Sequence, residues 1–477
     1  MLLVHPAHEV LRQLPLLIGS VVLGSATGNP LWSIAALVLM VVFGVARWFT
    51  TTYRIDAEQI QRREGVLQRT VLSVPRNRIR SVSTDARVLH RLLGLTVLRV
   101  STGREARGDA EFALDAVRSG EVPELRAILL ADSLTGPADT DGHAAPIRHV
   151  LARWQPSWLR YSPLSFTGLA MIAAAVGVIY QTGAVAALED SRLARQGLDA
   201  AERLGVVVTV VVAVLVVLAL GVLLSVARSL VTFGNLVLSL DEGTSGVLQL
   251  QHGMLRVREH TYDMRRLRGG TIREPLLVRA FGGARLDAMM TGVDGSGEAS
   301  LLLPPCPAAT VEAVLTELIG RPDVVSGQLR GHGPAATRRR WTRAMTLPGL
   351  LAPGLAVTAL VAPVPPLAWL LCAAVAVAGA FLAADRSRAL GHRVGDGWLV
   401  ARSGSLDRRR DCLAAAGIIG WTARQTLFQR RAGVATLIAA TPAGVKGYRV
   451  LDVPAEQAWS IAAAASPWVA DDDWAHS

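Results

Sequence analysis

The residues best suited to metal chemistry are a histidine-containing segment near the start of the chain and three cysteines. His5–Glu9 places two imidazoles and a carboxylate close together, and these are ligand types that zinc accepts. Pro6 disrupts helical geometry between the two histidines and no third ligand cluster is visible, so we favour a structural cap before an apolar run. Cys306, Cys372 and Cys412 lie far apart without a CxxC pair, which predicts neither a disulfide framework nor a zinc site.

The densest basic group is the best candidate for a ligand patch. It consists of Arg62, Arg63, Arg69, Arg76, Arg78 and Arg80. Alternate residues of a strand share a face, so several of these side chains can point the same way. Guanidinium groups suit bidentate contacts with phosphate. Specific recognition of a lipid headgroup, non-specific attraction to anionic lipid and a merely solvated face all remain open.

Other chemistry-bearing patterns have structural interpretations. Arg338–Arg340 with Trp341 resembles a nucleic-acid patch, but its place directly before an apolar run favours a topology anchor with an interfacial tryptophan. Arg408–Arg410 and the pair Gly282-Gly283 are expected in turns, the latter in a hairpin. A phosphate-binding loop, a nucleophile elbow and a His-Glu-x-x-His helix are all missing from the sequence. We therefore expect no catalytic residue, no cofactor, no metal and no enzymatic activity.

The composition indicates a membrane protein with polar attachments. Of 477 residues, 51% are hydrophobic and 18% charged, and the mean hydropathy is +0.36. A net charge of +11 would suggest nucleic-acid binding in a soluble chain. Here the arginines gather beside apolar runs, which is typical of topology signals, so we expect no nucleic-acid partner.

Six apolar runs, which form three pairs, are long enough to cross a membrane. They lie at 14–28 and 31–49, at 164–187 and 205–227, and on both sides of Pro363–Pro366 within 344–384. Arg47, near the end of 31–49, is the one charged residue in these runs, and none contains histidine, which argues against an ion-coupled pathway. Whether the short first run crosses fully is open.

Arginine flanks the runs at the ends that do not face the short turns: Arg12, Arg47, Arg153, Arg160, Arg228, Arg338–Arg340, Arg343, Arg386 and Arg388. The positive-inside rule therefore places the termini and the polar segments on the cytoplasmic side of the membrane.

The polar segments repeat one another. We divide the chain into 1–49, a first polar segment 50–133, a linker 134–163, spans 164–228, a second polar segment 229–322, a basic linker 323–343, spans 344–385, a third polar segment 386–466, and an acidic tail 467–477. Gly65, Gly253 and Gly404 are each followed by a second glycine 29 residues later, at Gly94, Gly282 and Gly433. An arginine stands three residues before each second glycine, at Arg91, Arg279 and Arg430. Proline opens a helix-like pattern at Pro123, Pro307 and Pro454, so each segment is expected to be several strands closed by one helix.

These residues carry a family resemblance. Gly65–Pro75, Arg78–Val82 and Leu89–Leu95 resemble the bacterial pleckstrin-homology (PH) membrane family of YdbS-like and YdbT-like proteins. The order of hairpin and then module, three times over, resembles the longer YdbT-like members. The resemblance implies three cytoplasmic α+β PH-like modules, each a small β-sandwich or partial barrel with a C-terminal helix, alternating with six transmembrane helices in three hairpins. The second and third segments match less well; Gly269-Gly270 lies in the second where the pattern departs.

Two functions of different classes follow. The first is a noncatalytic membrane-embedded scaffold or binding protein whose PH-like modules engage a partner protein or anionic lipid headgroups. By resemblance, the partner is a single-module member of the same family or another copy of this chain. The alternative is a component of lipid or amphipathic-peptide transport or export that contributes to envelope-stress or antimicrobial defence.

Overall fold

The protein is described by a computed structural model. It covers residues 52–56, 58–64, 70–75, 79, 81–86, 91–101, 112–122, 124–125, 128–129, 148–165, 170, 173, 177, 205–241, 246–293 and 300–469. The expected spans at 14–28 and 31–49, and nearly all of 164–187, lie outside the described residues. Two compact units make up the chain, Met1–Arg153 with Gly234–Arg266, and Trp154–Phe233 with Leu267–Ser477.

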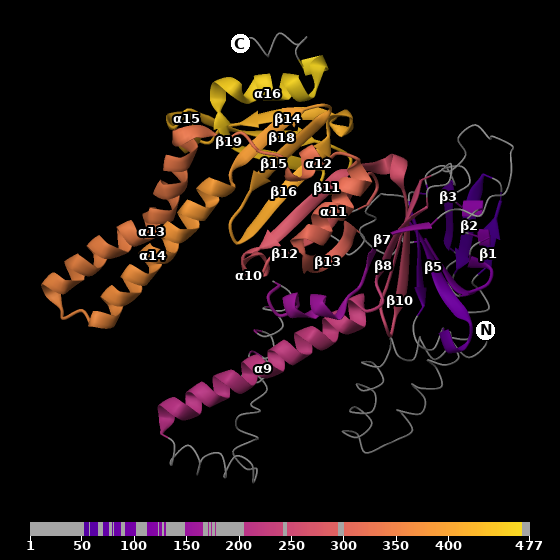
Figure 1. Ribbon diagram of the computed structural model, residues 1–477, viewed down its shortest axis with the longest axis horizontal. Helices are drawn as coiled ribbons and strands as arrows, with labels where there is room; N and C mark the ends of the chain where they lie inside the picture. The colour runs from indigo at the N-terminus through magenta and orange to yellow at the C-terminus, as the bar shows by residue number, and fades with distance from the viewer. Residues whose placement is uncertain are drawn as a thin grey trace. The chain divides into compact units, whose positions relative to one another are not determined.

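The first unit contains two antiparallel sheets (Figure 1). The smaller has β1 (Thr52–Ile55), β2 (Gln59–Glu64) and β3 (Thr70–Pro75) in that order. The larger has seven strands in the order β6-β5-β4-β10-β9-β8-β7. Its strands are β4 (Ser81–Ala86), β5 (Leu95–Ser101), β6 (Phe112–Arg118), β7 (Arg148–Arg153), β8 (Val237–Asp241), β9 (Val247–His252) and β10 (Val257–Asp263), with a 3₁₀ turn, η3 (Met264–Arg266), after β10. β7 comes from the stretch 134–163, which we expected to be a linker.

The second unit also contains two antiparallel sheets. The six-stranded sheet has the order β13-β12-β11-β16-β15-β14, and the other has the order β17-β18-β19. The strands are β11 (Leu267–Pro275), β12 (Gly283–Met290), β13 (Leu301–Pro307), β14 (Gly391–Gly395), β15 (Trp398–Ser403), β16 (Asp407–Ala414), β17 (Gly420–Arg424), β18 (Val434–Ala440) and β19 (Gly447–Pro454). The expectation of a turn at Arg408–Arg410 was wrong, because these residues lie inside β16, where β11 and β15 supply partners on both sides.

Short helices connect the strands and close the sheets. They are η2 (Pro156–Tyr161), α10 (Leu276–Ala280), α11 (Ala308–Ile319), α12 (Pro322–Ser326), η5 (Ala415–Gly417), α15 (Leu427–Arg431), η6 (Ala455–Gln457), α16 (Ala458–Ala465) and η7 (Pro467–Val469). Pro307 and Pro454 directly precede α11 and η6, as the proline pattern predicted. Gly282 does not form a hairpin; it has φ of 73° and joins α10 to β12. One face of α16 is buried against β14 and β18 in the core of the third polar segment.

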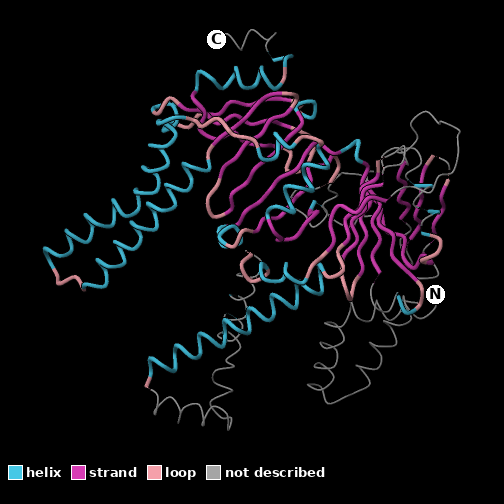
Figure 2. Tube along the Cα trace, viewed as in Figure 1, coloured by secondary structure: helices cyan, strands magenta, loops and turns pink. Residues whose placement is uncertain are grey.

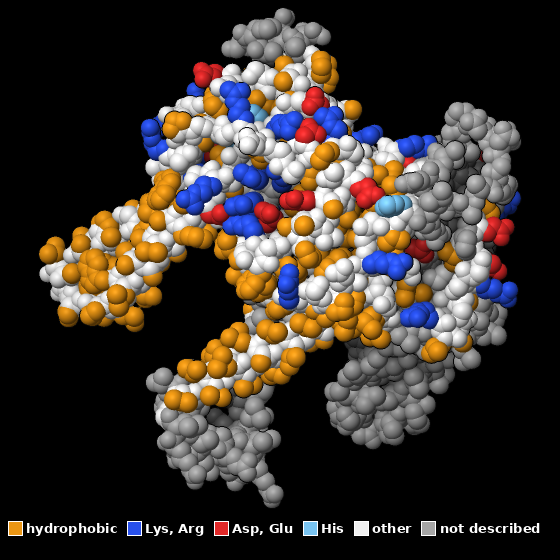
Figure 3. Space-filling model, viewed as in Figure 1, with side chains coloured by type: hydrophobic (Ala, Val, Ile, Leu, Met, Phe, Trp, Pro, Cys, Tyr) orange, Lys and Arg blue, Asp and Glu red, His pale blue; other side chains and the backbone are white. Residues whose placement is uncertain are grey.

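Three described helices are long and apolar enough to cross a membrane. They are α9 (Val206–Phe233), α13 (Gly333–Val361) and α14 (Pro366–Ala389), and they match the predicted runs 205–227 and 344–384. α13 and α14 pack side by side as an antiparallel hairpin (Figure 2). Hydrophobic side chains predominate along the three helices, whereas most of the visible charged side chains lie on the sheets (Figure 3). The expected basic linker 323–343 contains α12 and the first turns of α13, where Pro334 and two alanines favour a helix start.

The sheets join consecutive polar segments in one repeated way. Each segment contributes three strands to one sheet and the next three to another: β1–β3 and β4–β6, then β8–β10 and β11–β13, then β14–β16 and β17–β19. β4 of the first segment pairs with β10 of the second, and β11 of the second pairs with β16 of the third. We call these pairings the inter-segment junctions.

The two junctions have the same register. Arg258 lies opposite Asp85 in the first junction, and Arg409 lies opposite Arg273 in the second. When the segments are aligned on Gly65, Gly253 and Gly404, these pairs occupy the same positions. The local repeat in the sequence therefore becomes a repeat in long-range strand pairing.

Candidate functional site

The structure describes only part of the predicted basic patch. Arg63 lies in β2 with an exposed side chain, opposite Val71 of β3. Arg62 precedes it in β2. The rest of the patch lies outside the described residues, namely Arg69, Arg76, Arg78 and Arg80. Its ability to bind phosphate therefore stays a prediction.

A buried carboxylate ties α13 to the third polar segment. Asp452 of β19 is 1% exposed and holds a left-handed backbone conformation with φ of 54°. The Nη1 atom of Arg339 donates a hydrogen bond of 2.6 Å to its Oδ1 atom. The Nη2 atom of Arg340 lies 2.6 Å from its Oδ2 atom. We call Asp452, Arg339 and Arg340 the hairpin anchor.

A second side chain completes the coordination of this carboxylate. Gln429 of α15 donates from Nε2 to Oδ1 of Asp452 at 2.8 Å. Its own position is fixed by Thr426, which forms a capping box with it at the start of α15. Two guanidinium groups and one amide thus surround the negative charge of a single buried carboxylate. If that charge were removed, two cations would be left close together without a counter-charge.

Two buried histidines lie beside the hairpin anchor. Nδ1 of His332 lies 2.7 Å from the carbonyl oxygen of Leu451, and Nδ1 of His392 lies 2.9 Å from Nε2 of His332. A carbonyl oxygen only accepts, so Nδ1 of His332 carries the proton and Nε2 accepts from His392. This chain of bonds requires a neutral His332. Burial lowers the pKa of His332, and burial together with His332 and Arg330 lowers the pKa of His392 to about 4.

These histidines predict a loss of stability in mild acid. The unfolded chain protonates His392 below its ordinary pKa of 6.5, whereas the folded chain resists protonation until about 4. The contribution of neutral His392 to the free energy of unfolding is thus complete above pH 6.5 and declines as the pH falls towards about 4. We expect the free energy of unfolding of the detergent-solubilised protein to drop by about 2 kcal/mol between about pH 7.5 and about pH 5.

The control for this prediction is His392→Asn, which keeps a donor but does not titrate. Burial raises the pKa of Asp411 to about 6, which acts in the opposite direction in both proteins. The comparison of the two pH profiles, measured as melting temperature, therefore isolates the histidine. A variant with the same pH dependence as the wild type would show that His392 is not the titrating group.

The second helix of the hairpin has its own ionic contacts. Asp385 of α14 accepts from Nη2 of Arg279 in α10 at 2.8 Å and from Nη2 of Arg408 in β16 at 2.7 Å. Arg279 belongs to the second polar segment and Arg408 to the third. α14 is therefore bonded to both segments that share the six-stranded sheet.

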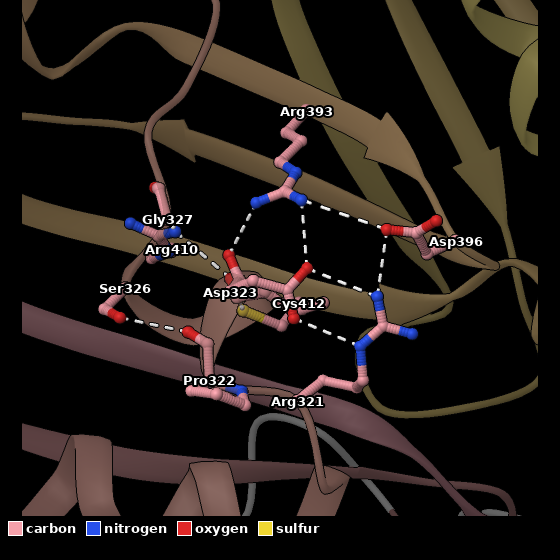
Figure 4. A network of polar contacts seen from close by, with 10 residues as sticks. Arg321, Pro322, Asp323, Ser326, Gly327, Arg393, Asp396, Arg410 and Cys412 are labelled. Atoms are coloured by element: carbon pink, nitrogen blue, oxygen red, sulfur yellow. Dashed lines mark hydrogen bonds and ion pairs between the residues drawn. The ribbon is translucent and has the colours of Figure 1, made fainter.

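A surface network fixes α12 beside the same sheet (Figure 4). Asp323 accepts hydrogen bonds from Arg321 at 3.1 Å and from Arg393 of β14 at 2.9 Å. Arg321 also donates to Asp396 at 2.9 Å, and Arg410 donates to the carbonyl oxygen of Gly327 at 2.8 Å. Exposed ion pairs of this kind contribute little to stability, so we assign them a positioning role.

The described residues form no site suited to metal or thiol chemistry. In the part of the chain that the structure describes, no group of three His, Cys, Asp or Glu side chains is arranged to hold a metal ion. The segment His5–Glu9 lies outside that part. All three cysteines are unpaired and buried, and burial raises the pKa of Cys306 and Cys412 to about 12, which makes these thiols poor nucleophiles.

Buried ion pairs attach polar sheets to helices that are apolar enough to cross a membrane. This combination is typical of a membrane-associated protein with polar β-domains. The family model of the bacterial PH domain matches residues 11–133 and 346–466, about half of the chain. The chain therefore belongs to the bacterial PH domain family. Both matched regions include apolar residues followed by a polar segment, and the second polar segment lies between them. No curated protein and no solved structure gave a significant match.

Sequence reasoning missed the hairpin anchor. It assigned Arg338–Arg340 to membrane topology alone, and the carboxylate that binds two of these arginines lies more than 100 residues away in the chain. One signal was available, because Asp452 interrupts the apolar run of Val450, Leu451 and Val453. A charge inside an apolar strand is costly unless it is paired.

Proposed function

We propose that this protein is a noncatalytic scaffold of the bacterial cell (inner) membrane. Six transmembrane helices in three hairpins carry three PH-like modules on the cytoplasmic side, and the modules engage a partner protein or anionic lipid headgroups. The basic patch of the first module is the contact surface. Membership of the bacterial PH domain family and the three described apolar helices support this proposal.

The observation that carries the proposal is the ionic attachment of the α13–α14 hairpin to the sheets. α13 is bonded through Asp452 and α14 through Asp385, so both helices are attached to the six- and three-stranded sheets of the second unit. A flexible tether would need no such bonds. A rigid attachment instead fixes which surface of a module faces the membrane, which is what a scaffold requires.

The basic patch predicts charge-dependent binding. Arg69→Glu combined with Arg78→Glu should weaken capture of anionic vesicles by proteoliposomes that contain the full-length protein by about tenfold, because each reversal replaces phosphate attraction with repulsion. The vesicles contain phosphatidylglycerol, and phosphatidylcholine vesicles give the background. The measurement is co-flotation of a fluorescent vesicle lipid.

The matched control is Arg54→Glu combined with Arg118→Glu. Both side chains are exposed and lie in the same polar segment, at 72% and 77% exposure, and the net charge changes equally. Equal loss in both variants would contradict a defined patch. If neither loses vesicle binding but the patch variant loses a protein captured by in-cell crosslinking, the ligand is a partner protein. Lipid flux across the proteoliposomes, absent from empty vesicles, would favour transport instead.

A further inference from the structure

Each inter-segment junction joins two strands, and the described part of the first and third polar segments contains one further strand of each kind at the edge of a sheet. In both junctions, the fourth strand of one segment pairs with the third strand of the next. The corresponding fourth strand of the third segment is β17, which ends its sheet, and the corresponding third strand of the first segment is β3, which also ends its sheet. Among the described strands, neither has a second neighbour.

These two edges carry the features that usually prevent strand pairing only at their ends. Proteins protect edges with charges or proline. β13 contains Pro304 and Pro305, and the edge strand β7 contains two arginines. β3 contains no charged residue and has proline only as its last residue, Pro75, while its Val71 is 56% exposed. Thr422, Ala423 and Arg424 of β17 are likewise exposed, with arginine only at the strand end.

The helix that follows β17 is also uncovered. In the second segment, the equivalent helix α10 contacts the next segment, where the backbone N–H of Leu276 donates to the carbonyl oxygen of Leu406 at 2.8 Å. The equivalent helix of the third segment, α15, leaves Leu427 and Phe428 74% and 73% exposed. Two large apolar side chains on one short helix beside an open strand edge indicate a surface that binds protein.

The landmark arginine of the first segment takes part in its junction, whereas that of the second, Arg279, donates to Asp385 of α14. Arg91 of the first segment donates to the carbonyl oxygen of Met254, which follows the landmark glycine of the second segment, at 3.0 Å. The equivalent residue of the third segment is Arg430, and its side chain is exposed on α15. β17, α15 and Arg430 of the third segment thus correspond to the strand, helix and arginine with which an earlier segment enters its junction.

We propose that β17 of one copy pairs antiparallel with β3 of a second copy of this chain, in the register of the two internal junctions. This register places Ala423 opposite Val71 and Thr422 opposite Leu72. Backbone hydrogen bonds would provide the affinity, as in other strand additions. Because the two edges differ, the contact is head-to-tail and can continue from copy to copy.

We take a second copy as the occupant because its β3 is a third strand of this repeat and, among the described strands, lies at the edge of its sheet. The inference rests on the scaffold role proposed above, in which all copies present their sheets on the same side of one membrane. It names the protein partner of that scaffold. The copies meet within the membrane plane, which raises their effective concentration.

Disulfide trapping tests the register. Val71→Cys in one tagged copy and Ala423→Cys in a differently tagged copy are coexpressed, and isolated membranes are oxidised. Directly opposed residues of antiparallel strands have Cα atoms about 4.5–5.5 Å apart, within the range of a disulfide. We expect a heterodimer that carries both tags. Thr422→Cys in place of Ala423→Cys should give less product by about tenfold, because its side chain points to the other face of the strand.

A positive control exists inside the chain. Thr84 and Glu259 face each other at the same position of the first junction, so Thr84→Cys with Glu259→Cys should form a disulfide within one chain. A disulfide there without a heterodimer between Val71→Cys and Ala423→Cys would overturn the inference. Phe428→Asp is a second variant; it alters only an exposed side chain and should reduce the heterodimer by about tenfold.

Two further outcomes would also overturn the inference. A disulfide confined to a single chain that carries both Val71→Cys and Ala423→Cys would show that β17 takes β3 of its own chain. Crosslinking of Ala423→Cys to a different protein would assign the edge to that protein. The vesicle assay with Arg69→Glu and Arg78→Glu is independent of these results, so loss of trapping with intact vesicle binding rejects the second copy and retains the scaffold.

Discussion

Asp452→Asn is expected to lower the free energy of unfolding by about 3–5 kcal/mol, because it removes the buried negative charge that pairs with two largely buried arginines. The side chains of Arg339 and Arg340 are 13% and 12% exposed, so water cannot replace the lost carboxylate. Asparagine keeps the size of the side chain and tolerates the left-handed backbone at this position. The substitution therefore tests the charge rather than the fold of β19. The measurement is thermal unfolding of the full chain in detergent.

The matched control is Asp396→Asn, which removes a carboxylate from the exposed network of α12. Asp396 is 60% exposed and contacts Arg321 and Arg393, so we expect a change below about 0.5 kcal/mol. Replacing Arg339 and Arg340 with glutamine in the Asp452→Asn background should recover part of the loss, because it removes the repulsion between the two cations. Equal melting temperatures for Asp452→Asn and Asp396→Asn would contradict an energetic role for the hairpin anchor.

The sequence predicted local structure well because the relevant signals are local. The second landmark glycines, Gly94, Gly282 and Gly433, have φ of 64°, 73° and 64°. A left-handed turn before a strand requires this conformation, and glycine adopts it without strain. The apolar runs of α9, α13 and α14 were equally clear, since length and hydropathy alone define a spanning helix.

The partners of the strands could not be predicted in the same way. An alternating pattern in β4 or β11 shows that a strand forms and which face is buried, but it carries no information on the neighbouring strand. The segments appeared as separate modules for that reason, and the sheets that join them were missed. The hairpin anchor was missed for a related reason, because Asp452 and Arg339 meet only through the tertiary fold. The predicted patch around Arg69 and Arg78 stays a prediction.

Gly269→Ala is expected to disrupt the second inter-segment junction. Gly269 has φ of 140°, a conformation that side chains disfavour, and lies at an irregularity in the pairing of β11 with β12. A Cβ atom there would lie 1.8 Å from the carbonyl oxygen of Cys412 in β16. That oxygen belongs to the backbone of the partner strand and cannot move without opening the pair. Backbone strain and overpacking together predict a loss of about 3–5 kcal/mol.

Hydrogen exchange would locate the effect. Amides of β11 and β16 should lose protection in Gly269→Ala, whereas those of β18, in the separate three-stranded sheet, should change less. Gly395→Ala is the control, since Gly395 lies in the same six-stranded sheet and no atom lies within 4 Å of its added Cβ. A small effect at Gly395 beside a large one at Gly269 would show that the junction depends on this close approach. Equal protection of β11 in both variants would contradict this prediction, because the junction would then tolerate a Cβ atom at position 269.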